Sequence, residues 1–96
     1  MFDQFTVTIS NDGRSGYVFY SEGLLRKHSF YWEFAGGDVV VSINVPSPVT
    51  WTAALPWAAG RRDEVLQRVA EELRRQQCPS CDPRIGDQWI EMVQQA

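Results

Sequence analysis

The sequence is poor in cysteine, histidine and net charge, and it contains no long apolar run. Its 96 residues include two cysteines and one histidine, with a formal net charge of -3. No stretch approaches the roughly 18 consecutive apolar residues of a membrane-spanning helix, and the first residues, MFDQF, lack the basic and apolar regions of a signal peptide. We therefore expect a cytoplasmic protein with no membrane partner. An acidic chain also lacks the positive field that gathers phosphate groups, so no nucleic-acid partner is expected.

No motif in the chain specifies a reaction. Gly36 and Gly37 are not followed by the lysine and hydroxyl residue of a phosphate-binding loop, and His28 has no nucleophile and aspartate near it in the sequence. Four acidic residues considered for acid–base chemistry each suit a strand face, a turn or a helix start instead: Glu33, Asp38, Asp63 and Glu64. The chain is therefore predicted not to be an enzyme and to need no cofactor.

The two cysteines form the sequence Cys78-Pro-Ser-Cys81, a spacing used by redox and zinc proteins. Here the pair follows the C-terminal end of a predicted helix, and the partial negative charge of that end disfavours a thiolate. A structural zinc site needs a tetrahedral set of ligands, and His28 is the one histidine available. We expect reduced thiols in a loop and no metal site. A CxxC metal or redox protein is kept as a less favoured alternative.

The composition is that of a globular chain, with 44% hydrophobic, 12% aromatic and 22% charged residues. A single core usually spans about 50 to 200 residues, so residues 1–96 are predicted to form one domain. A chain of this length buries only about two thirds of its unfolded surface, which leaves few large apolar residues beyond those of the core.

Alternation of apolar and polar residues predicts four strands, joined as two hairpins, at residues 5–9, 17–20, 28–34 and 39–45. The side chains expected to face the core are Phe5, Val7, Ile9, Phe30, Trp32, Phe34, Val39, Val41, Ile43 and Val45. By the same alternation, Val40 is expected on the opposite face of the sheet.

From residue 61 the apolar period changes to that of an amphipathic helix, with a core side made of Val65, Leu66, Val69, Ala70 and Leu73. Pro79 ends this helix by Gln77 or Cys78, and its start is expected near Arg61 or as early as Pro56. Residues 88–93 fit a strand or a helix, and a short final strand is favoured because an isolated short helix is marginal. The predicted fold is therefore α+β: an antiparallel four- to five-stranded meander sheet with one long amphipathic helix packed on one face.

Some aromatic residues remain once the core face is assigned. Tyr17 and Phe19 alternate with Val18 and Tyr20, so one aromatic pair must lie on the face away from the helix, and Tyr31 joins that side. Such a face meets a second subunit, a partner protein, or water that hydrates the tyrosine hydroxyls.

The segment TWTAALPWAAGRR at 50–62 is long for a loop, and a short helix is expected at its start. Because tryptophan is highly buried on average, at least one of Trp51 and Trp57 is expected to close the core. The other, together with Arg61 and Arg62, would form an aromatic and guanidinium patch of the kind enriched in interfaces.

These features predict a protein-interaction module without catalytic activity. The partner-binding residues proposed from the sequence are Tyr31, Trp51, Trp57, Arg61 and Arg62. In size, acidity and lack of a catalytic constellation the chain resembles bacterial immunity proteins and other small cytosolic inhibitors, which implies a protein partner of unknown identity. The alternative hypothesis is a homodimer whose sheet faces pair and which has a structural or small-ligand role.

Overall fold

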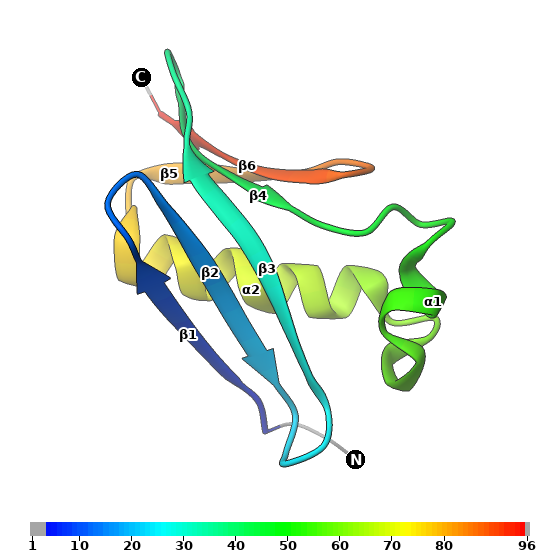
Figure 1. Ribbon diagram of the computed structural model, residues 1–96. Coiled ribbons are helices and arrows are strands. Elements are labelled where there is room, and N and C mark those ends of the chain that lie inside the picture. Colours follow the sequence, from blue (N-terminus) through cyan, green and yellow to red (C-terminus); the bar gives the residue numbers. More distant parts are fainter. Residues whose placement is uncertain (1–3, 96) are drawn as a thin grey trace.

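The computed structural model describes residues 4–95, which form one antiparallel sheet of six strands with a long helix across one of its faces (Figure 1). In chain order the elements are β1 Thr6–Asn11, β2 Ser15–Ser21, β3 Lys27–Phe34, β4 Val39–Asn44, α1 Trp51–Ala54, the short 3₁₀ helix η1 Pro56–Ala58, α2 Arg62–Gln77, β5 Cys81–Ile85 and β6 Trp89–Gln94. The predicted α+β class is confirmed. No helix within the described range is long and apolar enough to cross a membrane.

The strands lie in the order β1-β2-β3-β4-β6-β5, so the first four form the expected meander. After α2 the chain returns to the sheet, where β6 pairs with β4 and β5 becomes the far edge. The final strand predicted over 88–93 is confirmed as β6. The predicted strand count of four to five is too low because β5, with the sequence CDPRI, has a central proline and no apolar alternation.

The core lies between α2 and the inner face of the sheet. All five residues assigned to the apolar side of the helix are buried, and α2 ends at Gln77 as predicted. Most of the predicted core residues of the strands are also buried: Val7, Phe30, Trp32, Val41, Ile43 and Val45. Phe5 and Ile9 are partly buried and pack against the margin of this core.

Three side chains lie elsewhere than their alternation predicts. Val39, expected in the core, is only partly buried and does not belong to the core cluster. Phe34 is 44% exposed at the end of β3, where its ring meets the edge of Trp32 with the centroids 5.3 Å apart. Val40, expected on the outer face, packs against the core. The pairing of β4 with β6 shifts register between Val39 and Val41, and such an irregularity turns an intervening side chain away from the face that strict alternation gives it.

Cys78 and Cys81 form a disulfide directly after α2, which contradicts the expectation of reduced thiols. The chain turns sharply here, with the Cys81 backbone N–H donating to the Cys78 carbonyl at 3.0 Å. This turn brings the two Cα atoms to 5.4 Å, within the range that a disulfide spans. The disulfide therefore closes the connection between the long helix and the edge strand β5.

Strands β1, β2 and β3 are linked by a close contact at Gly16 of β2. Gly16 pairs with Trp32 of β3, and the Trp32 indole Nε1 donates to the Ser10 carbonyl on β1 at 3.0 Å. A Cβ atom at Gly16 would lie 2.1 Å from that carbonyl oxygen, so only glycine lets the indole and the neighbouring strand approach. Three strands are thereby held together at one point.

Candidate protein-interaction surface

The outer face of the sheet, turned away from α2, holds a contiguous group of aromatic side chains. Tyr17 and Phe19 of β2 are 47% and 46% exposed, and Tyr31 of β3 is partly exposed. Tyr17 is the cross-strand partner of Tyr31, and their rings meet edge to face with the centroids 5.8 Å apart. The rings of Tyr17 and Phe19 lie 6.2 Å apart along the strand. We call these three residues the aromatic surface.

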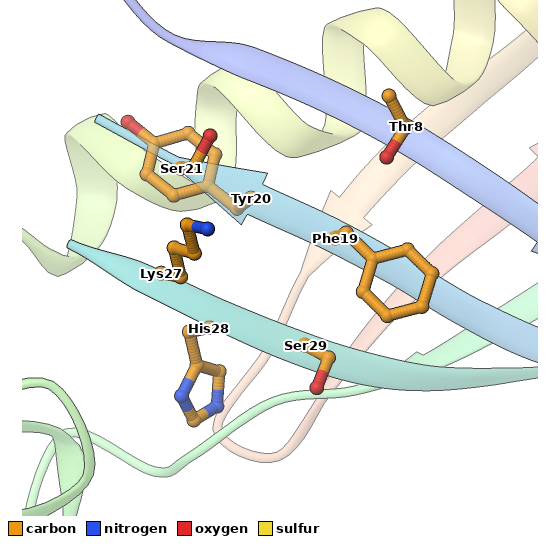
Figure 2. Close-up of a pocket in the computed structure, with 7 residues that line it drawn as sticks. All are labelled: Thr8, Phe19, Tyr20, Ser21, Lys27, His28 and Ser29. Atoms are coloured by element: carbon orange, nitrogen blue, oxygen red, sulfur yellow. The ribbon is translucent and has the colours of Figure 1, made fainter. Parts of the chain in front are cut away.

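Short polar side chains surround the aromatic surface. Figure 2 shows Thr8, Phe19 and Ser29 in one row across β1, β2 and β3, as their strand register requires. A shallow depression of about 390 Å³ beside Phe19 is lined in part by Ser21 and Lys27. Because serine and threonine are short, the phenyl ring of Phe19 projects above its cross-strand neighbours. The ring thus lines one side of this open depression and remains about half exposed to solvent.

The alternation along β2 explains why these rings lie outside. Val18 and Tyr20 point to the helix side and are 0% and 1% exposed, so the intervening Tyr17 and Phe19 must point outward. Alternation alone predicts an outward aromatic pair on this strand without deciding which residues form it, and Tyr31 is the one residue of the aromatic surface that was proposed as a site residue from the sequence. The alternation of β2 is the sequence signal for Tyr17 and Phe19, once Val18 and Tyr20 are known to face the helix.

The two tryptophans of the 50–62 segment have intramolecular roles. Trp51 is 2% exposed, and its indole Nε1 donates to the Ala58 carbonyl at 2.8 Å, so it closes one end of the core. This confirms that at least one of the pair acts as a core lid, and its burial leaves no surface for a partner. Trp57 is partly buried, with its ring stacked parallel to that of Tyr20 at 6.3 Å between centroids.

Arg61 belongs to a buried ion-pair network at one end of α2. Its guanidinium donates to both carboxylate oxygens of Glu22, at 3.1 and 2.6 Å, and to Glu64 at 2.5 Å. The side chain of Glu22 is 0% exposed and also accepts from the Tyr20 hydroxyl at 2.5 Å and from Arg68 at 3.1 Å. The network ties the end of β2 to the first turns of α2.

The electrostatics of this network indicate a structural role. Burial alone raises the pKa of the Glu22 carboxyl, but hydrogen bonds from Arg61 and Tyr20 outweigh burial and hold the pKa below its ordinary value. Burial, together with the hydrogen bond to Glu22, raises the pKa of Tyr20 to about 12. Glu22 is therefore ionised and Tyr20 protonated at neutral pH, so neither supplies a group that exchanges protons there.

Arg62 holds three backbone segments together. Its Nε donates to the Pro46 carbonyl at 3.0 Å, and one terminal nitrogen donates to the Gly86 and Asp87 carbonyls at 2.8 Å each. The side chain thus joins the loop after β4, the start of α2 and the turn between β5 and β6. Of the five partner-binding residues proposed from the sequence, only Tyr31 lies on the aromatic surface.

The remaining candidate groups do not assemble into a second site. Within residues 4–95, no three His, Cys, Asp or Glu side chains are grouped as the ligands of a metal ion would be. The ring of His28 lies 4.8 Å from that of Phe30, and burial lowers the pKa of this histidine. Glu33 accepts a long hydrogen bond, 3.4 Å, from the Tyr31 hydroxyl. Each side chain has a local structural partner.

A second exposed apolar feature lies at the tip of the hairpin between β2 and β3. Leu24 and Leu25 are 86% and 94% exposed. They follow Gly23, whose φ of 97° is the left-handed conformation that a tight turn requires. The tip presents two leucines from a turn, whereas the aromatic surface is held between paired strands.

Comparisons of the chain with protein-family models, with curated proteins and with solved structures find no significant match.

Proposed function

We propose that the chain is a protein-interaction module, of the inhibitor or immunity type and without catalytic activity, that binds a protein partner on the aromatic surface. The observation that supports this proposal is the exposure of Tyr17 and Phe19 on a sheet whose other face already packs a full core. Aromatic side chains are enriched among the residues that contribute most to binding, and they rarely gather on a surface without a use.

The scaffold under these rings favours tight association. β2 and β3 pair along seven residue positions, from Ser15 and Glu33 to Ser21 and Lys27. Rings fixed on paired strands lose little conformational freedom when a partner binds, which removes part of the entropic cost of association. The hydroxyl groups of Thr8 and Ser29 supply hydrogen-bonding groups at the rim, as interfaces usually have.

Affinity capture with matched variants tests the proposal. Phe19→Ser and Tyr17→Ser each remove one ring that is about half exposed, so the fold should be retained while affinity falls about tenfold or more. Leu25→Ser is the control, because it removes a 94% exposed apolar side chain outside the aromatic surface.

Each variant is immobilised and exposed to lysate of the source organism, and captured proteins are quantified by mass spectrometry. Circular dichroism verifies that each variant is folded. A protein retained by the native chain and by Leu25→Ser, but depleted with both ring variants, supports the proposal. Equal capture by all four chains, or loss with Leu25→Ser alone, rules out the aromatic surface as the contact site.

A further inference from the structure

The two edge strands of the sheet, β5 and β1, differ in how well they are protected against pairing with a further strand. At one edge, β5 places Pro83 between the charged residues Asp82 and Arg84. A proline cannot donate to a further strand, and charges discourage edge pairing. At the other edge, β1 has the sequence TVTISN, without proline or charge, and pairs with β2 in an uninterrupted register. An edge of this second kind is a template for another strand.

No segment within residues 4–95 pairs with the free edge of β1, which lies at the margin of the sheet in Figure 1. Among the described residues, α2 reaches this strand's backbone through a hydrogen bond from the Gln76 side-chain amide to the Val7 carbonyl, 3.4 Å long. Gln76 also donates to Glu72 at 2.9 Å, so its amide keeps a partner if a strand displaces it from Val7. The edge is open to pairing at little cost.

We infer that two copies of the chain associate edge to edge through β1, antiparallel about a two-fold axis at Thr8. In this register Val7 lies opposite Ile9 of the second copy, and Thr6 lies opposite Ser10. Val7 and Ile9 pack on the core side, whereas the three hydroxyl residues lie on the outer side, so apolar residues meet apolar residues and hydroxyl groups meet hydroxyl groups.

The self-complementarity of β1 selects a second copy as the occupant. An axis at Ile9 would instead set Val7 against Asn11 and break the match, whereas the axis at Thr8 matches every pair from Thr6 to Ser10. An isologous interface requires such a strand, because each residue meets the same patch on the other copy. The absence of charge within β1 means that the two-fold axis brings no like charges together inside the strand.

This association leaves the aromatic surface free. The aromatic rings point out of the sheet, whereas β1 pairs within the plane of the sheet, so the two copies would present two aromatic surfaces on the same side of one continuous sheet. The inference therefore does not rest on the proposed partner binding, and either can fail without the other. It also differs from a dimer in which the sheet faces pair, because that arrangement would bury Phe19.

Sedimentation equilibrium at tens of micromolar tests the inference. The native chain is expected at twice its monomer mass of 11.0 kDa. Thr8→Lys places two ammonium groups opposite each other at the axis and should weaken dimerisation at least tenfold. Ser29→Lys is the matched control, because it adds the same charge to an exposed outer-face position of β3 away from the edge. Thermal unfolding verifies that both variants remain folded.

Charge complementation makes the test specific for the register. Thr8→Asp alone should also dissociate, whereas an equimolar mixture of Thr8→Lys and Thr8→Asp should restore a heterodimer, because opposite charges then meet at the axis. A monomeric native chain overturns the inference, as does a Thr8→Lys dimer as tight as the Ser29→Lys dimer or a mixture that stays monomeric. A dimer lost in Phe19→Ser but kept in Thr8→Lys would show pairing through the sheet faces and would equally overturn it.

Discussion

Replacing Glu22 with glutamine tests whether the buried ion-pair network holds the end of β2 to α2. The variant keeps the size of the side chain but removes its charge, so Arg61 and Arg68, whose side chains are 27% and 19% exposed, face a neutral amide. The amide must also satisfy the Tyr20 hydroxyl, which donates to the carboxylate in the native chain. The perturbation is confined to one side chain with four hydrogen bonds from three residues.

The expected loss of stability in Glu22→Gln depends on how deeply each member of the network is buried. Removing one member of a fully buried ion pair costs about 3 to 5 kcal/mol. Here only Glu22 is fully buried, while both guanidinium groups reach solvent and already contact Glu64. We therefore expect Glu22→Gln to lower the free energy of unfolding by about 2 to 3 kcal/mol, which is at or below the lower limit of that range. For a domain of this size, each kcal/mol lowers the melting temperature by about 4 to 8 °C, which gives a fall of about 8 to 24 °C.

The contribution of Glu22 to stability should decrease as the pH is lowered. The folded-state pKa of Glu22 lies below its ordinary value of 4.5, so its contribution is fully present above the unfolded pKa and is lost as the pH falls through the folded pKa. Urea unfolding should therefore show a constant difference between the native chain and Glu22→Gln above about pH 5.5, and a shrinking difference on further acidification.

Glu64→Gln is the control for this experiment, because its side chain is 45% exposed and contacts the same two arginines. Solvent screens an exposed ion pair, so this variant should unfold near the native midpoint. A structural role for the buried Glu22 network is ruled out if Glu22→Gln destabilises the domain no more than Glu64→Gln, or if the loss of stability in Glu22→Gln is unchanged between neutral and acidic pH.

Two further predictions concern the fold. Gly16→Ala should lower the free energy of unfolding by about 3 kcal/mol or more, because the new Cβ would lie 2.1 Å from a backbone oxygen. Gly36→Ala is the control, because a Cβ at Gly36 would have no atom within 4 Å, and it should change the free energy of unfolding by less than about 1 kcal/mol. Urea titrations measure both. Equal effects would contradict the close contact at Gly16. The disulfide between Cys78 and Cys81 closes a very short loop, with a sequence separation of 3. Its reduction should therefore lower the free energy of unfolding by no more than about 2 kcal/mol, with the domain still folded by circular dichroism. Complete unfolding in reductant would contradict this.

Periodicity in the sequence predicts most of the architecture, since β1 to β4 alternate and α2 repeats with a clear apolar period, whereas β6 is favoured over a helix only because a short isolated helix is marginal. The failures have local physical causes. β5 is held by its pairing with β6 despite Pro83, and a register shift moves Val40 toward the core. The disulfide depends on the distance between two Cα atoms after a turn, which spacing along the chain does not specify.

The candidate site is less accessible to sequence reasoning. Alternation places Tyr31 outside correctly because it depends only on the strand period. The two arginines were assigned to a surface patch, but the partner of Arg61 is Glu22, 39 residues earlier, and Arg62 binds backbone carbonyls of distant loops. Arginine has intramolecular and intermolecular uses with the same local sequence, so only the three-dimensional contacts distinguish them.

Site-specific photo-crosslinking can show whether a partner protein binds on the aromatic surface. A photoreactive phenylalanine analogue is placed at position 19, on the aromatic surface, or at position 34 as a control, since Phe34 is 44% exposed beyond that surface. We expect a covalent adduct with one partner protein from position 19, lost when Tyr17→Ser is added, and no such adduct from position 34. The same adduct from both positions, or from position 34 alone, would contradict this expectation.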